Sequence, residues 1–388
     1  MYISDAVLYI GVNDKTLDLF ESQYRIPNGV SYNSYVILDD KVAVLDTVDA
    51  RATDCWMENL AAALNGRRPD YLIVSHMEPD HASNVARFAA EYPEAQIVGN
   101  AKTFGMIGQF FELDLTGRKV EVKEGDTLEL GHHTLQFFMA PMVHWPEVMV
   151  AYEQSEKILF SADGFGKFGA LDAEEPWEEE AARYYLNIVG KYGVQVQALL
   201  KKAAGLDIQM ICPLHGPVLK ENLGHYLDLY QTWSTYQPEE RGVLVAYASI
   251  HGNTAHAAEK MGELLRSRGV KAEVMDLSRT DMSLAVRKAF YYDRMVVAGA
   301  TYDGGVFPCM EEFLQHLKTK NFQKRKVGMM ENGSWAPLAA KVMRTILEPM
   351  KEITIVEPVV TIKSAVHADT LQVMEQLADV MAGEGAEQ

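Results

Sequence analysis

The C-terminal part of the chain alternates short apolar runs with amphipathic stretches in a regular rhythm. The apolar runs predict five strands, at residues 242–248, 272–277, 295–300, 326–330 and 353–360. The amphipathic stretches predict helices at residues 254–268, 283–290, 308–318, 335–350 and 369–381. Strict alternation of strand and helix is typical of a doubly wound parallel sheet. We therefore expect a five-stranded parallel sheet covered by helices.

The N-terminal part has a different pattern, in which hairpins are mixed with helices. β-branched runs at residues 34–38 and 42–45 predict a hairpin, and further strands are predicted at residues 71–74, 96–98, 120–122, 127–130, 135–139, 148–152, 158–160 and 208–211. Helical periodicity predicts helices at residues 52–64, 82–91 and 177–204. This mixture indicates layered sheets covered by helices, rather than a simple Rossmann alternation.

The polar segment between the two parts, at residues 237–242, contains Pro238 and Gly242 and predicts a linker. We place the domain boundary there, with one domain at residues 1–240 and the other at residues 241–388. A chain of 388 residues is long enough for two domains of ordinary size.

Composition and charge narrow the class of protein. The formal net charge of −18 disfavours nucleic acid and anionic membranes as partners. The three cysteines, Cys55, Cys212 and Cys309, form no C-x-x-C pair, which argues against a disulfide framework and an iron–sulfur cluster. The N-terminus lacks the pattern of a signal peptide, and no apolar run is long enough for a membrane helix. We expect a soluble, cytoplasmic protein.

One local motif concentrates potential metal ligands. His76-x-Glu78-x-Asp80-His81 places four of them within six positions, directly after the predicted strand at residues 71–74. Pro79 stiffens this loop. A single histidine after a strand is usually a hydrogen-bonded loop residue, but a cluster of this density indicates a metal site.

Three further candidates follow apolar strands in the same way, beside glycine or proline: His144, Asp163 and His215. Four histidines and three carboxylates are too many ligands for one tetrahedral zinc and enough for two metals. Asp163 is a natural bridge, because a carboxylate has two oxygens to share. Imidazole and carboxylate ligands without thiolate suit iron, manganese or zinc, and the carboxylates favour iron. The remaining histidines are expected to be solvated: His132, His133, His225, His256, His316 and His367.

The C-terminal part carries three loops that predict a ligand site. The first strand there is followed by Ser249, Ile250, His251, Gly252, Asn253 and Thr254, where small polar side chains and backbone N–H groups form an anion site at a helix N-terminus. The loop lacks a P-loop lysine, which argues against ATP or GTP. Two later strands end in Thr301, Tyr302, Asp303, Gly304 and Gly305, and in Asn332, Gly333, Ser334 and Trp335. Tyr302 and Trp335 either stack on a planar ring of the ligand, such as an isoalloxazine if the ligand is a flavin, or cap helices.

Together these motifs resemble a known family. The H-x-x-x-D-H core with later His, Asp and His is similar to the metallo-β-lactamase superfamily, in which hydrolases usually carry histidine at the position of Glu78. That departure and the flavodoxin-like second part resemble the flavodiiron proteins (A-type flavoproteins) over nearly the whole chain. The resemblance implies a metallo-β-lactamase-like αββα sandwich followed by a flavodoxin-like five-stranded parallel sheet that binds FMN.

The resemblance also implies site roles. One iron would be held by His76, Glu78 and His144, and the second by Asp80, His81 and His215, with Asp163 as the bridge; in the family the histidine at His81 either binds or turns away. Tyr184 or Tyr185 would approach the metals or pack in the core. Many members have a histidine near the site in the segment that here reads Tyr24-Arg25-Ile26-Pro27, and its absence leaves the substrate preference open.

The activity implied is reduction of O₂ to water, of NO to N₂O, or of both, with electrons passing from an external donor through FMN to a non-haem diiron site. Without C-x-x-C pairs there is no fused rubredoxin, so a separate rubredoxin or reduced deazaflavin would be the donor. The resemblance implies a head-to-tail homodimer, alone or as a dimer of dimers. Two alternatives stay open: a dinuclear zinc hydrolase with a regulatory flavodoxin-like module, and a binding module without flavin.

Overall fold

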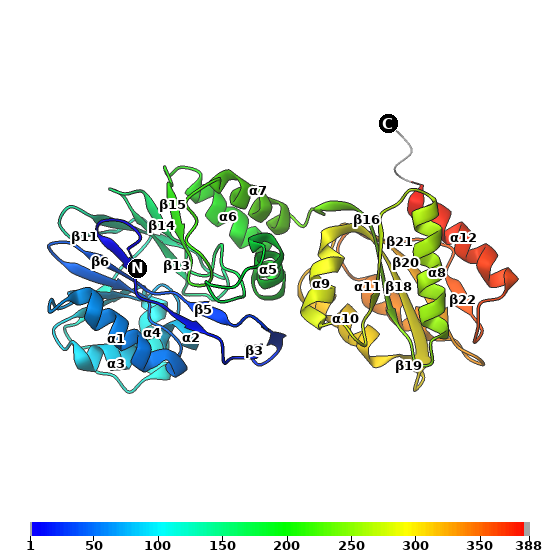
Figure 1. Cartoon of the computed structure of the whole chain (residues 1–388), viewed down its shortest axis with the longest axis horizontal. Coiled ribbons are helices and arrows are strands. Elements are labelled where there is room, and N and C mark those ends of the chain that lie inside the picture. Colours follow the sequence, from blue (N-terminus) through cyan, green and yellow to red (C-terminus); the bar gives the residue numbers. More distant parts are fainter. Residues whose placement is uncertain (1, 384–388) are drawn as a thin grey trace. The chain divides into compact units, whose positions relative to one another are not determined.

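The computed structural model describes residues 2–383; residue 1 and residues 384–388, at the outer ends of the two predicted domains, lie outside the described part. The chain forms two compact units. The first comprises Met1–Tyr185 and Tyr192–Gln231, and the second comprises Leu186–Lys191 and Thr232–Gln388. Each has its own sheets and helices (Figure 1). Within residues 2–383, no helix is both long and apolar enough to cross a bilayer.

The first unit is built on two sheets with a shared apolar core. The first sheet has the order β1 (Val7–Tyr9), β6 (Tyr35–Leu38), β7 (Val42–Leu45), β8 (Tyr71–Ile73), β9 (Gln96–Gly99) and β10 (Lys119–Glu121). The second has the order β11 (Thr127–Glu129), β12 (Thr134–Met139), β13 (Met149–Glu153), β14 (Ile158–Phe160) and β15 (Met210–Cys212). Short ribbons pair β2 (Val12–Asp14) with β5 (Val30–Tyr32), and β3 (Leu19–Phe20) with β4 (Tyr24–Arg25).

Alternate side chains of each strand fill the space between these two sheets. Residues 35 and 37, and 43 and 45, enter it from the first sheet, and residues 135 and 137, 149 and 151, and 158 and 160 enter it from the second. This period of two is the side-chain repeat of a strand with one face buried. The predicted layered sheets and the hairpin of β6 and β7 are therefore confirmed.

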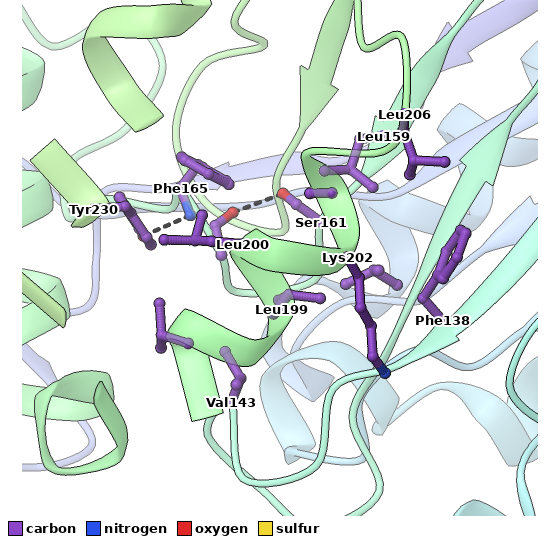
Figure 2. Close-up of a pocket in the computed structure, with 14 residues that line it drawn as sticks. Phe138, Val143, Leu159, Ser161, Phe165, Leu199, Leu200, Lys202, Leu206 and Tyr230 are labelled. Atoms are coloured by element: carbon purple, nitrogen blue, oxygen red, sulfur yellow. Dashed lines mark hydrogen bonds between the residues drawn. The ribbon is translucent and has the colours of Figure 1, made fainter. Parts of the chain in front are cut away.

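Helices cover the outer faces of the two sheets (Figure 1). They are α1 (Thr53–Leu64), α2 (Pro79–Ala82), α3 (Val85–Glu91), α4 (Ala101–Phe110), α5 (Trp177–Tyr184), α6 (Gly193–Ala203) and α7 (Leu223–Ser234), with a 3-10 turn η1 (Ala50–Ala52) before α1. In α1 the buried residues Trp56, Leu60 and Leu64 recur every four positions, which places them on one face. Helix α6 packs over the second sheet, and a small apolar cavity remains beneath it (Figure 2).

The single helix predicted at residues 177–204 is wrong. Helix α5 gives way to a π-helical segment η2 (Tyr185–Val189) and a 3-10 turn η3 (Gly190–Tyr192) before α6 begins. Two glycines, Gly190 and Gly193, lower the helix propensity at this point. The hydroxyl of Tyr236 donates to the Gly190 carbonyl over 2.8 Å, so a tertiary contact holds the break.

The second unit is a parallel sheet with the order β17 (Ala272–Asp276), β16 (Glu240–Ala248), β18 (Tyr292–Tyr302), β20 (Arg325–Asn332) and β21 (Ile353–Ile355). In chain order this is 2-1-3-4-5, the flavodoxin-like arrangement. The short β19 (Gly305–Val306) pairs antiparallel with β18. Helices α8 (Asn253–Ser267) and α12 (Ala368–Ala382) pack together on one face, and α9 (Met282–Tyr291), α10 (Pro308–Thr319) and α11 (Ala339–Leu347) pack on the other.

Two predicted elements of this unit differ from the structure. The strand predicted at residues 353–360 is split into β21 and β22 (Val360–Ile362), both paired with β20, because Pro358 has no N–H to give to the ladder. The helix predicted at residues 335–350 begins only at Ala339, after Pro337. The alternation of strands and helices is otherwise as predicted.

His133 is not solvated as predicted; it is buried between two acidic side chains. Its Nδ1 lies 2.7 Å from Asp39 Oδ2, and its Nε2 lies 3.0 Å from Glu156 Oε1. Asp39 belongs to the turn between β6 and β7, and His133 to the turn between β11 and β12, so the contact joins a strand turn of each sheet. His225, His256, His316 and His367 are exposed or partly exposed.

Replacing His133 with alanine is expected to destabilise the first unit by about 1–3 kcal/mol, because two partly buried carboxylates lose a hydrogen-bond donor. Burial lowers the pKa of His133, but Asp39 and Glu156 outweigh it and raise the pKa. The histidine's contribution is therefore complete below about pH 6.5 and is lost as pH rises through the folded-state pKa. Urea unfolding at pH 5.5 and pH 8.5 measures this; a loss equal at both pH values contradicts the charged contact. His132→Ala, at the exposed neighbour, is the control.

Candidate functional site

Four loops of the first unit bring the seven predicted metal ligands together. His76 and Glu78 follow β8, and Asp80 and His81 lie in the short helix α2. The other three follow strands of the second sheet: His144 after β12, Asp163 after β14 and His215 after β15. The site therefore lies where strand ends of both sheets meet.

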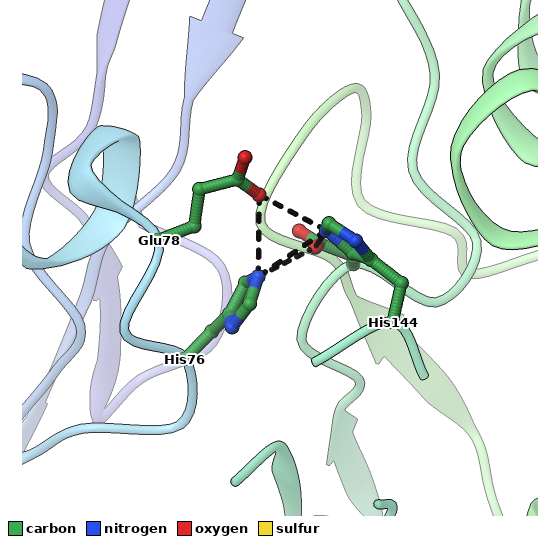
Figure 3. A group of neighbouring side chains, drawn as sticks. His76, Glu78 and His144 are labelled. Carbon is green, nitrogen blue, oxygen red and sulfur yellow. Dashed lines mark hydrogen bonds and ion pairs between the residues drawn. The ribbon is translucent and has the colours of Figure 1, made fainter. Parts of the chain in front are cut away.

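The first group of ligand atoms consists of His76, Glu78, His144 and Asp163 (Figure 3). Glu78 Oε2 lies 3.3 Å from His76 Nε2 and 3.0 Å from His144 Nε2. Asp163 Oδ2 lies 3.2 Å from His76 Nε2 and 3.1 Å from His144 Nε2. Two imidazole nitrogens and two carboxylate oxygens therefore face one point.

The second group consists of Asp80, His81 and His215, and it meets the other oxygen of Asp163. Asp80 Oδ2 lies 3.4 Å from His81 Nε2 and 3.2 Å from His215 Nε2. Asp163 Oδ1 lies 3.3 Å from His81 Nε2 and 3.9 Å from His215 Nε2. His81 is turned into this group, with its Nε2 3.0 Å from that of His215.

The spacing of these atoms suits metal ions. Metal–ligand bonds of about 2.0–2.2 Å place neighbouring ligand atoms roughly 3.0–3.6 Å apart. Among the described residues, both oxygens of Asp80 and both of Asp163 are buried without a hydrogen-bond partner of good geometry. Buried oxygens of this kind require a compensating partner. The donor set fits two cations on either side of Asp163.

The carboxylates and histidines of the first ligand group shift one another's pKa values. Burial alone would raise the pKa of Asp163, but His76 and His144 hold it well below its usual range. Burial would lower the pKa of His144, yet Asp163 and Glu78 raise it to about 9. The carboxylates thus attract positive charge to this point, as a cation site requires.

Two ligand histidines have fixed orientations. Glu147 Oε1 lies 2.8 Å from His76 Nδ1 and accepts from the Met77 backbone N–H over 2.8 Å. His215 Nδ1 donates to the Ser31 carbonyl over 2.8 Å. Each contact holds the proton on Nδ1, on the side of the ring away from the ligand groups, and leaves Nε2 free to bind a metal. Glu147 was not among the residues predicted from the sequence. The one feature that could have indicated it is its position, three residues after the predicted ligand His144.

The backbone around Asp163 is unusual. Ala162 and Phe165 both have positive φ, at 50° and 65°, a region that residues other than glycine seldom adopt. Asp46, with φ 54°, accepts hydrogen bonds at Oδ1 from the backbone N–H groups of Ser75 and His76, over 2.7 and 3.3 Å. Burial raises the pKa of Asp46 to about 6. Tight turns of the backbone therefore position Asp163, and the Asp46 carboxylate holds the backbone at His76.

The two tyrosines predicted near the metals have different surroundings. Tyr184 is buried, and its ring centroid is 5.5 Å from that of His215. Burial, followed by the charge of Asp163, raises its pKa well above the usual range. The Tyr185 ring instead packs against Tyr230, with centroids 5.1 Å apart. Tyr184 is thus the one that borders the ligand groups.

A pocket of about 240 Å³ opens onto Glu78 and Asp80 and is also lined by Glu21. Part of the Glu21 side chain faces solvent. Loss of hydration at the carboxyl group, and then the negative charge of Glu78, raise its pKa to about 7. The segment 24–27, which lacks the family's histidine, contributes no residue to the pocket wall, and Glu21 comes from the turn just before it. This is a polar, acidic approach to the ligand groups.

The second unit has a pocket of about 630 Å³ at the carboxyl ends of β16, β18 and β20. Its wall contains all the predicted cofactor-binding residues except Gly252: Ser249, Ile250, His251, Asn253, Thr254, Thr301, Tyr302, Asp303, Gly304, Asn332, Gly333, Ser334 and Trp335. Gly252 caps α8 with φ 93°. Sequence reasoning missed Ala300, Ala336, Leu338 and Ser364.

Loop contacts shape this pocket. Asn332 Nδ2 donates to the Ser364 carbonyl, and Ser364 N–H donates to Asn332 Oδ1, each over 3.1 Å. Thr301 Oγ1 accepts from the backbone N–H groups at the start of α11. Trp335 is 92% exposed and Tyr302 is 44% exposed. Both rings are therefore accessible to a planar ligand, although Tyr302 also packs edge-on against Phe307 at the start of α10.

Two known domain families match the chain in the order of these units. Residues 30–216 match the family described as ODP family beta lactamase, and residues 245–363 match the flavodoxin family. An uncharacterized protein of Methanocaldococcus jannaschii is 28% identical over 321 residues, or 81% of each chain. The anaerobic nitric oxide reductase flavorubredoxin of Aliivibrio salmonicida is 27% identical over 349 residues, or 86% of this chain and 69% of the relative.

Solved structures share the fold over nearly the whole chain. The rubredoxin oxygen:oxidoreductase of Desulfovibrio gigas has a TM-score of 0.93 at 24% identity, covering 99% of this chain and 98% of that one. The flavodiiron protein of Giardia intestinalis has a TM-score of 0.92 at 22% identity, covering 98% and 97%. With a β-lactamase-like domain followed by a flavodoxin domain, the chain belongs to the flavodiiron proteins.

Proposed function

We propose that this protein is a flavodiiron oxidoreductase that takes electrons from an external donor and reduces O₂ to water, NO to N₂O, or both. The observation that carries the proposal is the meeting of two ligand groups at the two oxygens of Asp163, in a chain that also has a flavodoxin-type pocket. The names of two relatives, a nitric oxide reductase and an oxygen oxidoreductase, support these substrates.

In this proposal His76, Glu78 and His144 hold one iron, and Asp80, His81 and His215 hold the other, with Asp163 between them. When bound, the two irons would supply redox centres that exchange single electrons with the gas, and FMN would supply a store of one or two electrons. Glu147 and the Ser31 carbonyl fix the tautomers of His76 and His215. Glu21 lies at the polar opening, where a carboxyl group can exchange the protons that reduction of either gas consumes.

We assign the pocket of the second unit to FMN. The loop from Ser249 to Thr254 would bind the phosphate at the N-terminus of α8, and Tyr302 and Trp335 would border the ring system. The domain limits at residues 1–240 and 241–388 remain a prediction. A cytoplasmic location, a rubredoxin or deazaflavin donor, and a head-to-tail dimer in which the flavin of one copy serves the metals of another are part of the same proposal.

The alternative of a dinuclear zinc hydrolase is not favoured. Glu78 stands where such hydrolases usually carry histidine, and the flavodoxin domain has no role in hydrolysis. The flavin-free binding module is also disfavoured, because a pocket of about 630 Å³ lies where flavodoxin-like sheets bind ligands.

The proposal is tested by anaerobic turnover. Enzyme reduced chemically under argon is mixed with O₂ or with NO, and consumption of the two gases is measured side by side, with iron and FMN content determined on the same sample. Two irons and one FMN per chain, with consumption of at least one gas, are expected. Two zincs without FMN, and no gas consumption, would contradict it. Mixing an Asp163 variant with an FMN-free variant then tests electron transfer between copies, since recovered activity requires it.

Replacing Gly252 with valine is expected to raise the FMN dissociation constant about tenfold. The binding conformation of the loop keeps this residue at φ 93°, where a non-glycine residue costs about 1–2 kcal/mol. A loop with valine relaxes out of this conformation when FMN is not bound, so the cost appears in the dissociation constant. Quenching of FMN fluorescence on titration measures the constant. Gly269→Val is a matched control, since Gly269 also has positive φ (76°) and open space at Cβ but lies after the C-terminal end of α8, outside the loop from Ser249 to Thr254. Equal FMN affinity in wild type and Gly252→Val would contradict the assignment of this loop.

A further inference from the structure

An apolar cavity of about 20 Å³ lies between helix α6 and the second sheet (Figure 2). Leu199 and Leu200 enter it from the helix, and Val150 and Leu159 enter it from strands β13 and β14. Its walls are almost entirely apolar. A cavity needs a volume of about 10–15 Å³ to hold one water-sized molecule, so this one has room for one small guest.

The polar side chains that border the cavity are engaged elsewhere. Ser161 Oγ donates to the Gly164 carbonyl over 2.6 Å, and Tyr230 Oη accepts from the Phe165 N–H over 2.5 Å; Figure 2 marks both contacts. Lys202 Nζ donates to Glu124 Oε2 and to the Met139 carbonyl, each over 2.8 Å. A water molecule needs two to four polar partners, so a cavity with these walls stays dry. It is suited to an apolar guest.

The cavity is also lined by residues that neighbour two of the metal ligands in the sequence. Val143, which lines it, is the residue before His144, and Ser161, Gly164 and Phe165 lie within two positions of Asp163. The polar pocket of about 240 Å³ reaches the ligand groups through Glu78 and Asp80 instead. Two spaces of opposite chemistry therefore border the loops that carry the ligands: an acidic pocket lined by two of the ligands themselves, and an apolar cavity lined by residues next to two others in the sequence.

We propose that this cavity is a binding site for a small apolar diatomic gas, which waits there beside the ligand loops. The proposal rests on the reductase function, because O₂ and NO are the gases that the site would consume. Neither gas is charged and both are weakly solvated by water, so both partition into a dry apolar space. The acidic pocket is left for water and protons.

The test is krypton binding to crystals of the oxidised holoprotein under pressure, located by anomalous scattering. Krypton is expected in the cavity of the wild type. Leu200→Phe, which fills the space, should remove the krypton and raise the KM for O₂ or NO by at least ~3-fold with kcat retained. Val196→Ala, which enlarges it, should raise krypton occupancy and keeps the test open if the phenylalanine variant does not fold. Val194→Phe, at a residue of the same helix that is 76% exposed, is the matched control.

The outcomes separate this proposal from the function. An empty cavity in the wild type, or a KM that Leu200→Phe leaves unchanged, would overturn the gas site whatever the enzyme reduces. Krypton in the cavity of a protein that consumes neither O₂ nor NO would overturn the proposed function, and with it the assignment of the guest as a substrate.

Discussion

Replacing Asp163 with asparagine is expected to reduce the iron content from two per chain to one or fewer and to lower gas reduction by more than ~100-fold. Loss of a group that only orients a metal ligand typically costs 10–100-fold, and a shared ligand should cost more. Oδ2 of Asp163 faces the first ligand group and Oδ1 faces the second. An asparagine offers one oxygen and one NH₂ group, so its NH₂ would point at one group of imidazoles and cannot bind a cation there.

The measurement is metal content by elemental analysis, with O₂ and NO consumption on the same preparation. FMN content should be unchanged, because the flavin pocket lies wholly within the second unit. Asp172→Asn is the control: Asp172 pairs with Lys15 at the surface, where an ion pair contributes little. An Asp163→Asn protein that keeps two irons and more than a tenth of its activity would show that Asp163 does not bridge the metals.

The sequence predicted the ligand groups because their information is local. His76, Glu78, Asp80 and His81 lie within six positions after a buried strand, and the other three ligands each follow an apolar strand beside glycine or proline. Strand ends gather at sheet edges, so these positions converge without knowledge of the exact packing. Whether each binds metal stays a prediction, which the variants above are designed to test.

The fold of the second unit could be predicted from the sequence for a related reason. Parallel strands buried on both faces form continuous apolar runs, and the loops that follow them lie on one edge. The three loops that we assign to FMN could therefore be placed from the alternation of strands and helices alone. The split of the last strand at Pro358 and the late start of α11 depend on single residues that a periodicity window averages over.

What the sequence did not reveal depends on distant contacts. Glu21 reaches the metal side only because the ribbon of β3 and β4 folds over that end of the unit. His133 is buried because the turns after β6 and β11 meet, which joins residues 94 positions apart. The break between α5 and α6 is held by Tyr236, far along the chain. None of these contacts has a local pattern.

Glu147 is the most consequential of the missed residues, and replacing it with alanine is expected to weaken iron binding by about 10–100-fold. Its Oε1 accepts from His76 Nδ1 and from Met77 N–H, and the residue has no exposed surface. Burial would raise the pKa of Glu147, but His76 holds it below its usual range, so the carboxylate stays charged beside the imidazole. Without it, the His76 ring is free to turn or to change tautomer.

Iron titration of the metal-free protein measures the effect, and the conservative variant distinguishes orientation from folding. Glu147→Gln keeps an oxygen for the same two donors and should lose only a few-fold in affinity, because geometry survives and only charge is removed. Glu153 is the matched control: it lies at the other end of β13, is equally buried, and accepts backbone N–H groups from Ser155 and Glu156. Glu153→Ala should therefore lower stability without changing iron affinity in the folded protein. If Glu147→Ala and Glu153→Ala behave alike in both assays, Glu147 supports the fold and does not orient His76.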